Sequence, residues 1–148
     1  MLHKRSANER GSSLIEVALV LPVLLVLFLG IVEVAFLLFA HVQVANATRE
    51  GARHGSLCRL HGNCDSLTDV VKTTVLGEAQ FLNMTDADSG GNTTVVVQPS
   101  SLASAPPVGD PITVTVTHNY SPPFVSNFVP MFPSQIPVEH TLIMHFDK

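Results

Sequence analysis

The chain has 148 residues, which is enough for one domain, and its formal net charge is −4 at neutral pH. Hydrophobic residues make up 46% of it and charged residues only 14%, which is more apolar than a domain of this size can hide from water. The acidic balance and the lack of a basic cluster with interleaved aromatic residues exclude nucleic acid as a partner.

The excess of apolar residues lies in one run, residues 17–40, whose only formal charge is Glu33. As a helix this run reaches about 36 Å, longer than the roughly 30 Å of a bilayer core. Basic residues precede it, at Lys4, Arg5 and Arg10. By the positive-inside rule, we expect a single-pass helix with a cytoplasmic N-terminus and an exported C-terminal domain.

The helical pattern continues beyond the apolar run without a stop signal, and Gly51 and Gly55 are expected to fray its end. Small residues in this part would let another helix or the sheet approach closely, and we favour an ordinary helix-on-sheet contact. After a short loop, Asp65 or Ser66 is expected to cap a second helix that ends near Asn83.

Beyond residue 92 the period changes from helical to alternating. Strands are predicted over residues 93–98, 112–119 and 138–146, and the connection 121–137 is rich in Pro and Phe. The predicted fold class is α+β, a long N-terminal transmembrane helix followed by a helix packed on an antiparallel sheet of about three strands. We divide the chain into a leader (1–11), a transmembrane and extended helix (12–55) and an exported domain (56–148).

One motif joins the basic leader to the apolar helix: Gly11-Ser-Ser-Leu-Ile-Glu16. It resembles the cleavage signature of type IV prepilins, in which a membrane peptidase cuts after the glycine. The resemblance is closer to the TadE-like pseudopilins of the tight-adherence (Tad/Flp) pilus family, through residues 11–22, Gly30-Ile-Val-Glu33 and residues 47–53. It covers roughly the first 55 residues.

The resemblance implies a function in pilus assembly and cell adhesion, with processing between Gly11 and Ser12 by prepilin peptidase. It also implies that other pilin-like subunits, the pilus assembly platform and the lipid bilayer of the inner (cytoplasmic) membrane are partners, and that the subunit is inserted into the pilus or at its tip or base. The domain after residue 55 favours a minor subunit, because the major pilin of such systems is a shorter chain with little beyond its helix.

Glu16 and Pro22 are the candidate assembly residues of the helix. A new N-terminal ammonium at Ser12 of a neighbouring subunit would pair with Glu16 and set the helix register. Alternatively, Glu16 lies in the headgroup zone, favoured by the helix dipole. Pro22 removes the backbone hydrogen bond to Ala18 and should kink or loosen the helix, unless it is merely a tolerated membrane proline.

Glu33 has three interpretations, because a carboxylate within an apolar run is costly unless it is neutral or paired. It is protonated in the membrane, or the apolar core ends at Val32 and Glu33 lies at the exported surface or pairs within a helix bundle. A proton relay is the third interpretation. We favour the two structural interpretations.

Cys58 and Cys64 are the only cysteines, and in an exported loop we expect a disulfide between them. With His54 and His61 they would offer four zinc ligands, but their spacing matches no zinc-finger pattern. We therefore predict no metal and no cofactor. The histidines at 118, 140 and 145 are interpreted as exposed strand residues, and the lack of a catalytic motif predicts that the chain is not an enzyme.

Two alternatives to a pilus subunit remain open. The first is a signal-anchored periplasmic or surface binding module that is not processed at Gly11 and whose loop from Phe124 to Phe132 contacts a ligand. The second is a secreted domain with a signal peptide ending at Ala45-Asn-Ala47, which we disfavour because the apolar run is too long and contains Glu33.

Overall fold

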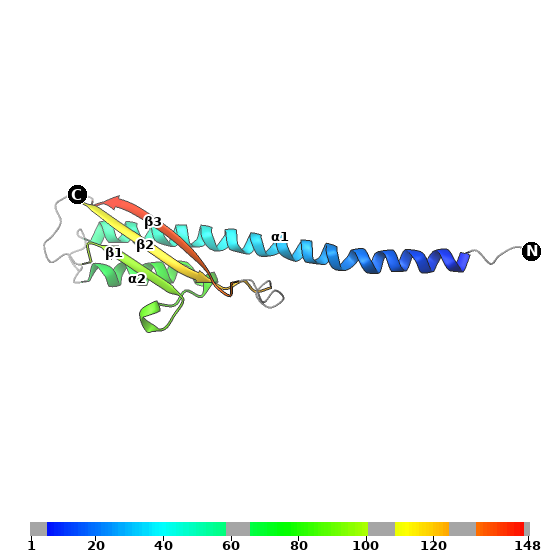
Figure 1. Ribbon diagram of the computed structural model, residues 1–148. Helices are drawn as coiled ribbons and strands as arrows, with labels where there is room; N and C mark the ends of the chain where they lie inside the picture. Colours follow the sequence, from blue (N-terminus) through cyan, green and yellow to red (C-terminus); the bar gives the residue numbers. More distant parts are fainter. Residues whose placement is uncertain (1–5, 59–65, 101–108, 125–132, 147–148) are drawn as a thin grey trace, which may run out of the picture.

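The computed structural model describes residues 6–58, 66–100, 109–124 and 133–146. A single long helix, α1 (Ser6–Leu57), carries a small domain on its C-terminal part, while its N-terminal part projects as a rod (Figure 1). The domain adds α2 (Leu67–Glu78) and a sheet of β1 (Thr93–Gln98), β2 (Pro111–Tyr120) and β3 (Ile136–His145). The predicted α+β fold class is confirmed.

Helix α1 begins at Ser6, inside the predicted leader, and continues through Pro22 to Leu57. The expected fraying at Gly51 and Gly55 is wrong, because both glycines are buried in the helix where it crosses the domain. A Cβ atom at Gly51 would lie 2.5 Å from Cγ2 of Val75 on α2. These glycines therefore let α1 approach α2 closely rather than ending the helix.

The second helix begins as the sequence predicts. The Ser66 side chain accepts a hydrogen bond from the Asp69 backbone N–H at 3.3 Å, which caps the first turn of α2. The predicted end near Asn83 is late by one turn, because α2 ends at Glu78 and a 3₁₀ turn, η2 (Gln80–Leu82), follows. Asn83 itself is in the left-handed region, with φ of 47°, and closes that turn.

The three strands form one antiparallel sheet in the order β1-β2-β3. The predicted segments agree with the observed strands to within two residues at each end. The largest difference is at the start of β3, which includes Pro137 from the predicted loop. The turn before β1, expected over residues 86–92, contains the 3₁₀ turn η3 (Ala87–Ser89).

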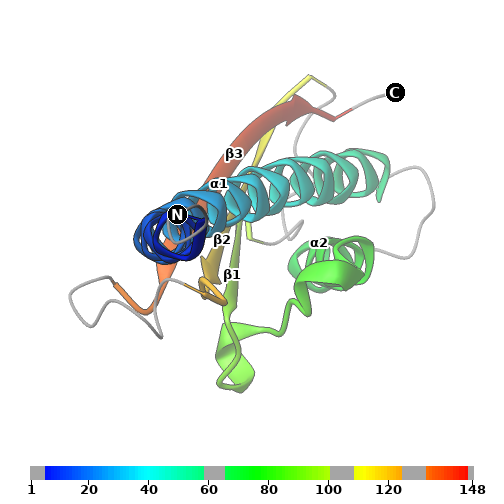
Figure 2. The same ribbon diagram turned by 90° about the vertical axis from the view of Figure 1, so that its right-hand side faces the viewer.

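Both helices pack on the same face of the sheet, which is visible when the molecule is viewed along α1 (Figure 2). The core between the layers is mostly aliphatic, and its largest fully buried side chains include Phe146, Leu67, Ile112, Val44 and Val71. Burial of this apolar surface holds the domain on the C-terminal part of α1.

One prediction for the sheet is wrong. His118 is not exposed: it is only 2% accessible, and its Nδ1 atom lies 2.9 Å from the Thr93 hydroxyl oxygen across the β1–β2 pair. His140 is half-buried, whereas His145 is exposed. The alternation that buries Ile112 and Val114 places His118 on the same inner face. The two-residue period of the strand therefore indicated that His118 is buried.

Candidate functional site

The rod of α1 is the most unusual surface of the molecule. From Ser13 to Phe28 every residue is exposed, and most of these residues are Leu, Val or Ile. Among the described residues, the segment Ser13–Leu57 is the one helix long and apolar enough to cross a membrane. This surface fits a single-pass membrane anchor.

Large apolar side chains on this helix recur at alternating steps of four and three residues. They are at least half exposed at Val20, Leu24, Leu27, Ile31, Val34 and Leu38. This spacing puts them on one face of the helix, and it is the spacing with which two helices pack side by side. The stripe runs from the bare rod into the part of α1 that carries the domain.

Glu33 is the point where the domain begins to cover α1. Its side chain is only 7% exposed, although the helix below it is bare. Its Oε2 atom accepts a hydrogen bond from the backbone N–H of Phe124 at 3.2 Å, and its Oε1 atom has no hydrogen-bond partner among the described residues. The loop after β2 therefore shields the single charge of the apolar run from the surroundings of the helix.

Tyr120, the last residue of β2, lies near this carboxylate. Burial, reinforced by the negative charge of Glu33, raises the pKa of the Tyr120 hydroxyl above its ordinary value. This arrangement places Glu33 at the boundary between the bare part of α1 and the domain, where it pairs with another element.

Two aromatic pairs flank α1 just above Glu33. Phe36 of α1 lies 6.5 Å from Phe124, measured between ring centroids, and Phe39 lies 6.4 Å from Phe81 in an edge-to-face arrangement. Phe81 follows α2, and Phe124 follows β2, so both come from the end of the domain nearest the rod. The sequence predicted aromatic residues in the loop after β2, but Phe128 and Phe132 lie outside the described residues.

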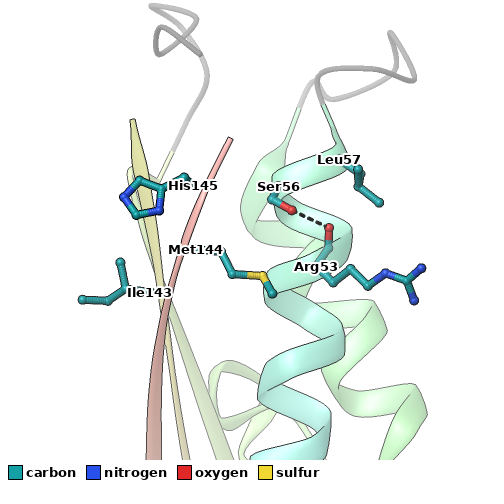
Figure 3. A pocket seen from close by; sticks show the side chains of 6 residues that line it. All are labelled: Arg53, Ser56, Leu57, Ile143, Met144 and His145. Atoms are coloured by element: carbon teal, nitrogen blue, oxygen red, sulfur yellow. Dashed lines mark hydrogen bonds between the residues drawn. The ribbon is translucent and has the colours of Figure 1, made fainter. Parts of the chain in front are cut away.

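At the opposite end of the domain, a shallow hollow lies between the end of α1 and β3. Figure 3 shows Met144 pointing toward α1, whereas Ile143 and His145 project to the other side of β3 and Arg53 points away from the strand. The Ser56 hydroxyl donates to the Arg53 carbonyl oxygen at 2.9 Å. The polar groups that line this hollow do not converge on a common point.

Residues 11–53 of the chain match the family of TadE-like proteins. The long helix is TadE-like. The family consists of structural pilus components rather than enzymes, and the match ends within α1, before the globular domain is complete. No curated protein and no solved structure matches the chain.

The predicted processing and assembly residues all lie along the TadE-like helix. Gly11 and Ser12 are helical in the backbone, Glu16 is exposed on the bare rod, and Pro22 is accommodated without interrupting the helix. Among the candidate site residues from Glu16 onward, whose side chains the structure describes, only Glu33 is brought against another element, by its hydrogen bond to Phe124. The roles of these residues remain predictions.

The predicted disulfide lies at the end of the TadE-like helix. Cys58 directly follows α1, is 5% exposed and is not a free thiol, while Cys64 lies outside the described residues, so their pairing stays a prediction. Of the possible zinc ligands, His54 is engaged instead with Glu50, at 3.2 Å between Nε2 and Oε1. His61 also lies outside the described residues.

Proposed function

We propose that this chain is a pilin-like subunit for the assembly of a tight-adherence type IV pilus, held in the inner membrane by α1 before it is incorporated. The TadE-like match over residues 11–53 is the single observation that carries the proposal. The geometry supports the proposal, because the N-terminal part of the matched helix is exposed and apolar, as a membrane anchor is, and its C-terminal part is buried by the domain. The subunit is a minor one, with its domain on the exported side.

In this proposal, prepilin peptidase removes residues 1–11 by hydrolysing the bond between Gly11 and Ser12. Hydrolysis leaves an ammonium group on Ser12, four residues before Glu16. In the bilayer a carboxylate near the helix start is costly unless it is paired, and the ammonium of a neighbouring subunit is a suitable partner. This pair fixes the register of adjacent helices.

The apolar stripe of α1 supplies the second part of the mechanism. In the membrane these side chains contact lipid, and in the filament they contact the helices of neighbouring subunits, which the 4–3 spacing permits. Because both surroundings are apolar, the transfer from bilayer to filament exposes little of this stripe to water. The domain, which is held above Glu33, stays outside the helical core of the filament.

The test is the N-terminus of the full-length protein recovered from membranes, measured by intact mass and N-terminal sequencing, with and without prepilin peptidase. A start at Ser12 that depends on the peptidase is expected. A Gly11→Leu variant should keep its leader, and a Gly30→Leu variant, changed where nothing lies within 4 Å of the added Cβ, should be processed normally.

Two results would overturn the proposal. A leader retained in the presence of active peptidase would leave a signal-anchored binding module, because a simple anchor does not need cleavage. A start at Thr48 would identify a signal peptide and a secreted domain.

A further inference from the structure

We propose that four aromatic side chains, Phe36, Phe39, Phe81 and Phe124, form a collar that rests in the headgroup layer on the exported side of the membrane. The partner of this surface is lipid, and contact with it sets the height of the domain on the bilayer. The inference rests on the membrane anchoring by α1 that is part of the proposed function. It goes further by assigning a lipid contact to the globular domain itself.

The position of the collar along α1 is the first argument. Residues 13–32, which lie below Glu33, span about 30 Å as a helix, which matches the hydrocarbon core. Phe36 and Phe39 lie four and seven residues beyond Val32, or about 6 Å and 10 Å higher. The polar layer on each side of the core is roughly 5–8 Å thick, so Phe36 falls within it. Phe39 starts just beyond its outer edge, and side chains on a helix lean back toward the N-terminus, which is toward this layer.

The second argument is exposure. Phe81 is 85% exposed although it comes from the globular domain, and Phe36 and Phe39 are 46% and 44% exposed. Phe124 is half-buried against Phe36. A cluster of partly exposed large aromatic side chains at one end of a small domain is costly in water, and Phe is among the apolar residues with which amphipathic helices enter the boundary between headgroups and acyl chains.

The third argument is charge. From residue 34 to residue 48, α1 carries no Asp, Glu, Lys or Arg, so the helix stays compatible with lipid well above Glu33. Glu33 itself is covered by the loop that brings Phe124 to the helix. The domain thus extends along α1 as far as Glu33, the one charge in the apolar run. The segment that covers Glu33 there contains Phe124.

Lipid fits this surface better than a second protein chain, because the collar continues the exposed apolar surface of the anchor. Its rings come from α1, from η2 after α2 and from the loop after β2. Glu78, which is three residues before Phe81 at the end of α2, is exposed and acidic. The contact is therefore apolar rather than electrostatic, and we expect it with zwitterionic lipid.

The sequence contains no tryptophan, so single substitutions provide clean fluorescent probes of this contact. Three full-length variants would be reconstituted in phosphatidylcholine vesicles, with and without bromine on the acyl chains next to the headgroup. Phe81→Trp reports the collar, Val26→Trp reports the bare rod, and Ile143→Trp reports the exposed outer face of β3. These three side chains are 85%, 71% and 60% exposed, so the substitutions leave the core intact.

We expect blue-shifted emission and several-fold stronger bromine quenching for Phe81→Trp than for Ile143→Trp, with little change on adding salt. Quenching of Val26→Trp but not of Phe81→Trp would overturn the collar and leave the membrane anchor intact. A blue shift of Phe81→Trp without quenching would show that protein, such as a second copy, covers this surface, which also overturns it. Absence of quenching at Val26→Trp would overturn the anchor together with the collar.

Discussion

Two glycines decide how closely α1 approaches the rest of the domain. At Gly55 an added Cβ would lie 2.7 Å from Cδ1 of Ile112 and 2.9 Å from Cγ2 of Val71, and at Gly51 it would lie 2.5 Å from Cγ2 of Val75. Separations this short require the side chains of Val75, Ile112 and Val71, or the elements that carry them, to shift. Glycine therefore serves close packing here, although it is a poor helix former.

Gly51→Ala is expected to destabilise the domain by about 1–3 kcal/mol, because overpacking outweighs the gain in helix propensity. Gly77 in α2 is the matched control, since nothing lies within 4 Å of its added Cβ. Gly77→Ala should be neutral or stabilising by up to about 1 kcal/mol. Denaturant unfolding of the full-length protein in detergent measures both, and equal effects would contradict the packing argument.

At the residue scale, the sequence predicted that Glu33 needs shielding but not what shields it. The apolar run around it made an unpaired carboxylate costly, and this conclusion needs only local information. The hydrogen-bond donor, the Phe124 N–H, is 91 residues away in the chain. No local period or spacing relates two such positions, so only the folded topology reveals the contact.

At the scale of elements, β2 places a histidine in the core between the helices and the sheet. Burial lowers the pKa of His118. The pKa of His140 on β3 is lowered by burial and by the positive charges of Arg49 and His41. Both side chains are therefore more readily protonated in the unfolded chain, where the pKa is about 6.5. Their contribution to stability is complete above that pH and is lost as the pH falls toward the lowered values.

We therefore expect the domain to lose stability between about pH 7 and about pH 5. A His118→Asn variant should lose less stability over this pH range, because it lacks the buried ionisable group. The loss of stability that remains includes the contribution of His140. Thermal melting followed by circular dichroism at both pH values measures the difference. His145→Asn, an exposed position on the same sheet, is the control and should behave as the parent protein.

Strands and helices differed in how well the sequence predicted their limits. Alternation of Val and Thr places the strands within two residues, because a sheet with one buried face needs that period. The end of α2 was predicted one turn late, since Phe81 continues the apolar spacing that began at Leu67. In the structure Phe81 lies in η2 and is 85% exposed. The helical spacing of Phe81 from the apolar residues of α2 therefore does not correspond to burial on the same face.

At the scale of the whole molecule, α1 belongs both to the bare rod and to the core of the domain. Ala40 and Val44 are fully buried by the domain, whereas Leu24 lies on the exposed rod of the same unbroken helix. The family resemblance could be predicted from sequence because it lies in this helix, where motif and spacing are local. The part of the domain beyond α1 carries no comparable motif.

Loss of the Glu16 carboxylate should abolish piliation without unfolding the domain. We expect Glu16→Ala to be processed at Gly11 and to remain folded, yet to leave cells without pili, because the register pair is missing. Sheared-pilus yield and electron microscopy in a strain lacking the native subunit measure the effect. Glu78→Ala, an exposed acid on α2, is the matched control, and normal piliation in both variants would contradict the assigned role.

Because α1 is continuous, any inclination of the anchor is passed on to the domain in full. From Leu24, near the centre of the bare segment, to Leu57 the helix extends about 50 Å. Membrane-spanning helices incline by about 20° on average, which displaces the far end sideways by about 17 Å. In the proposed membrane-anchored subunit, such an inclination moves the far end of the domain sideways across the membrane surface.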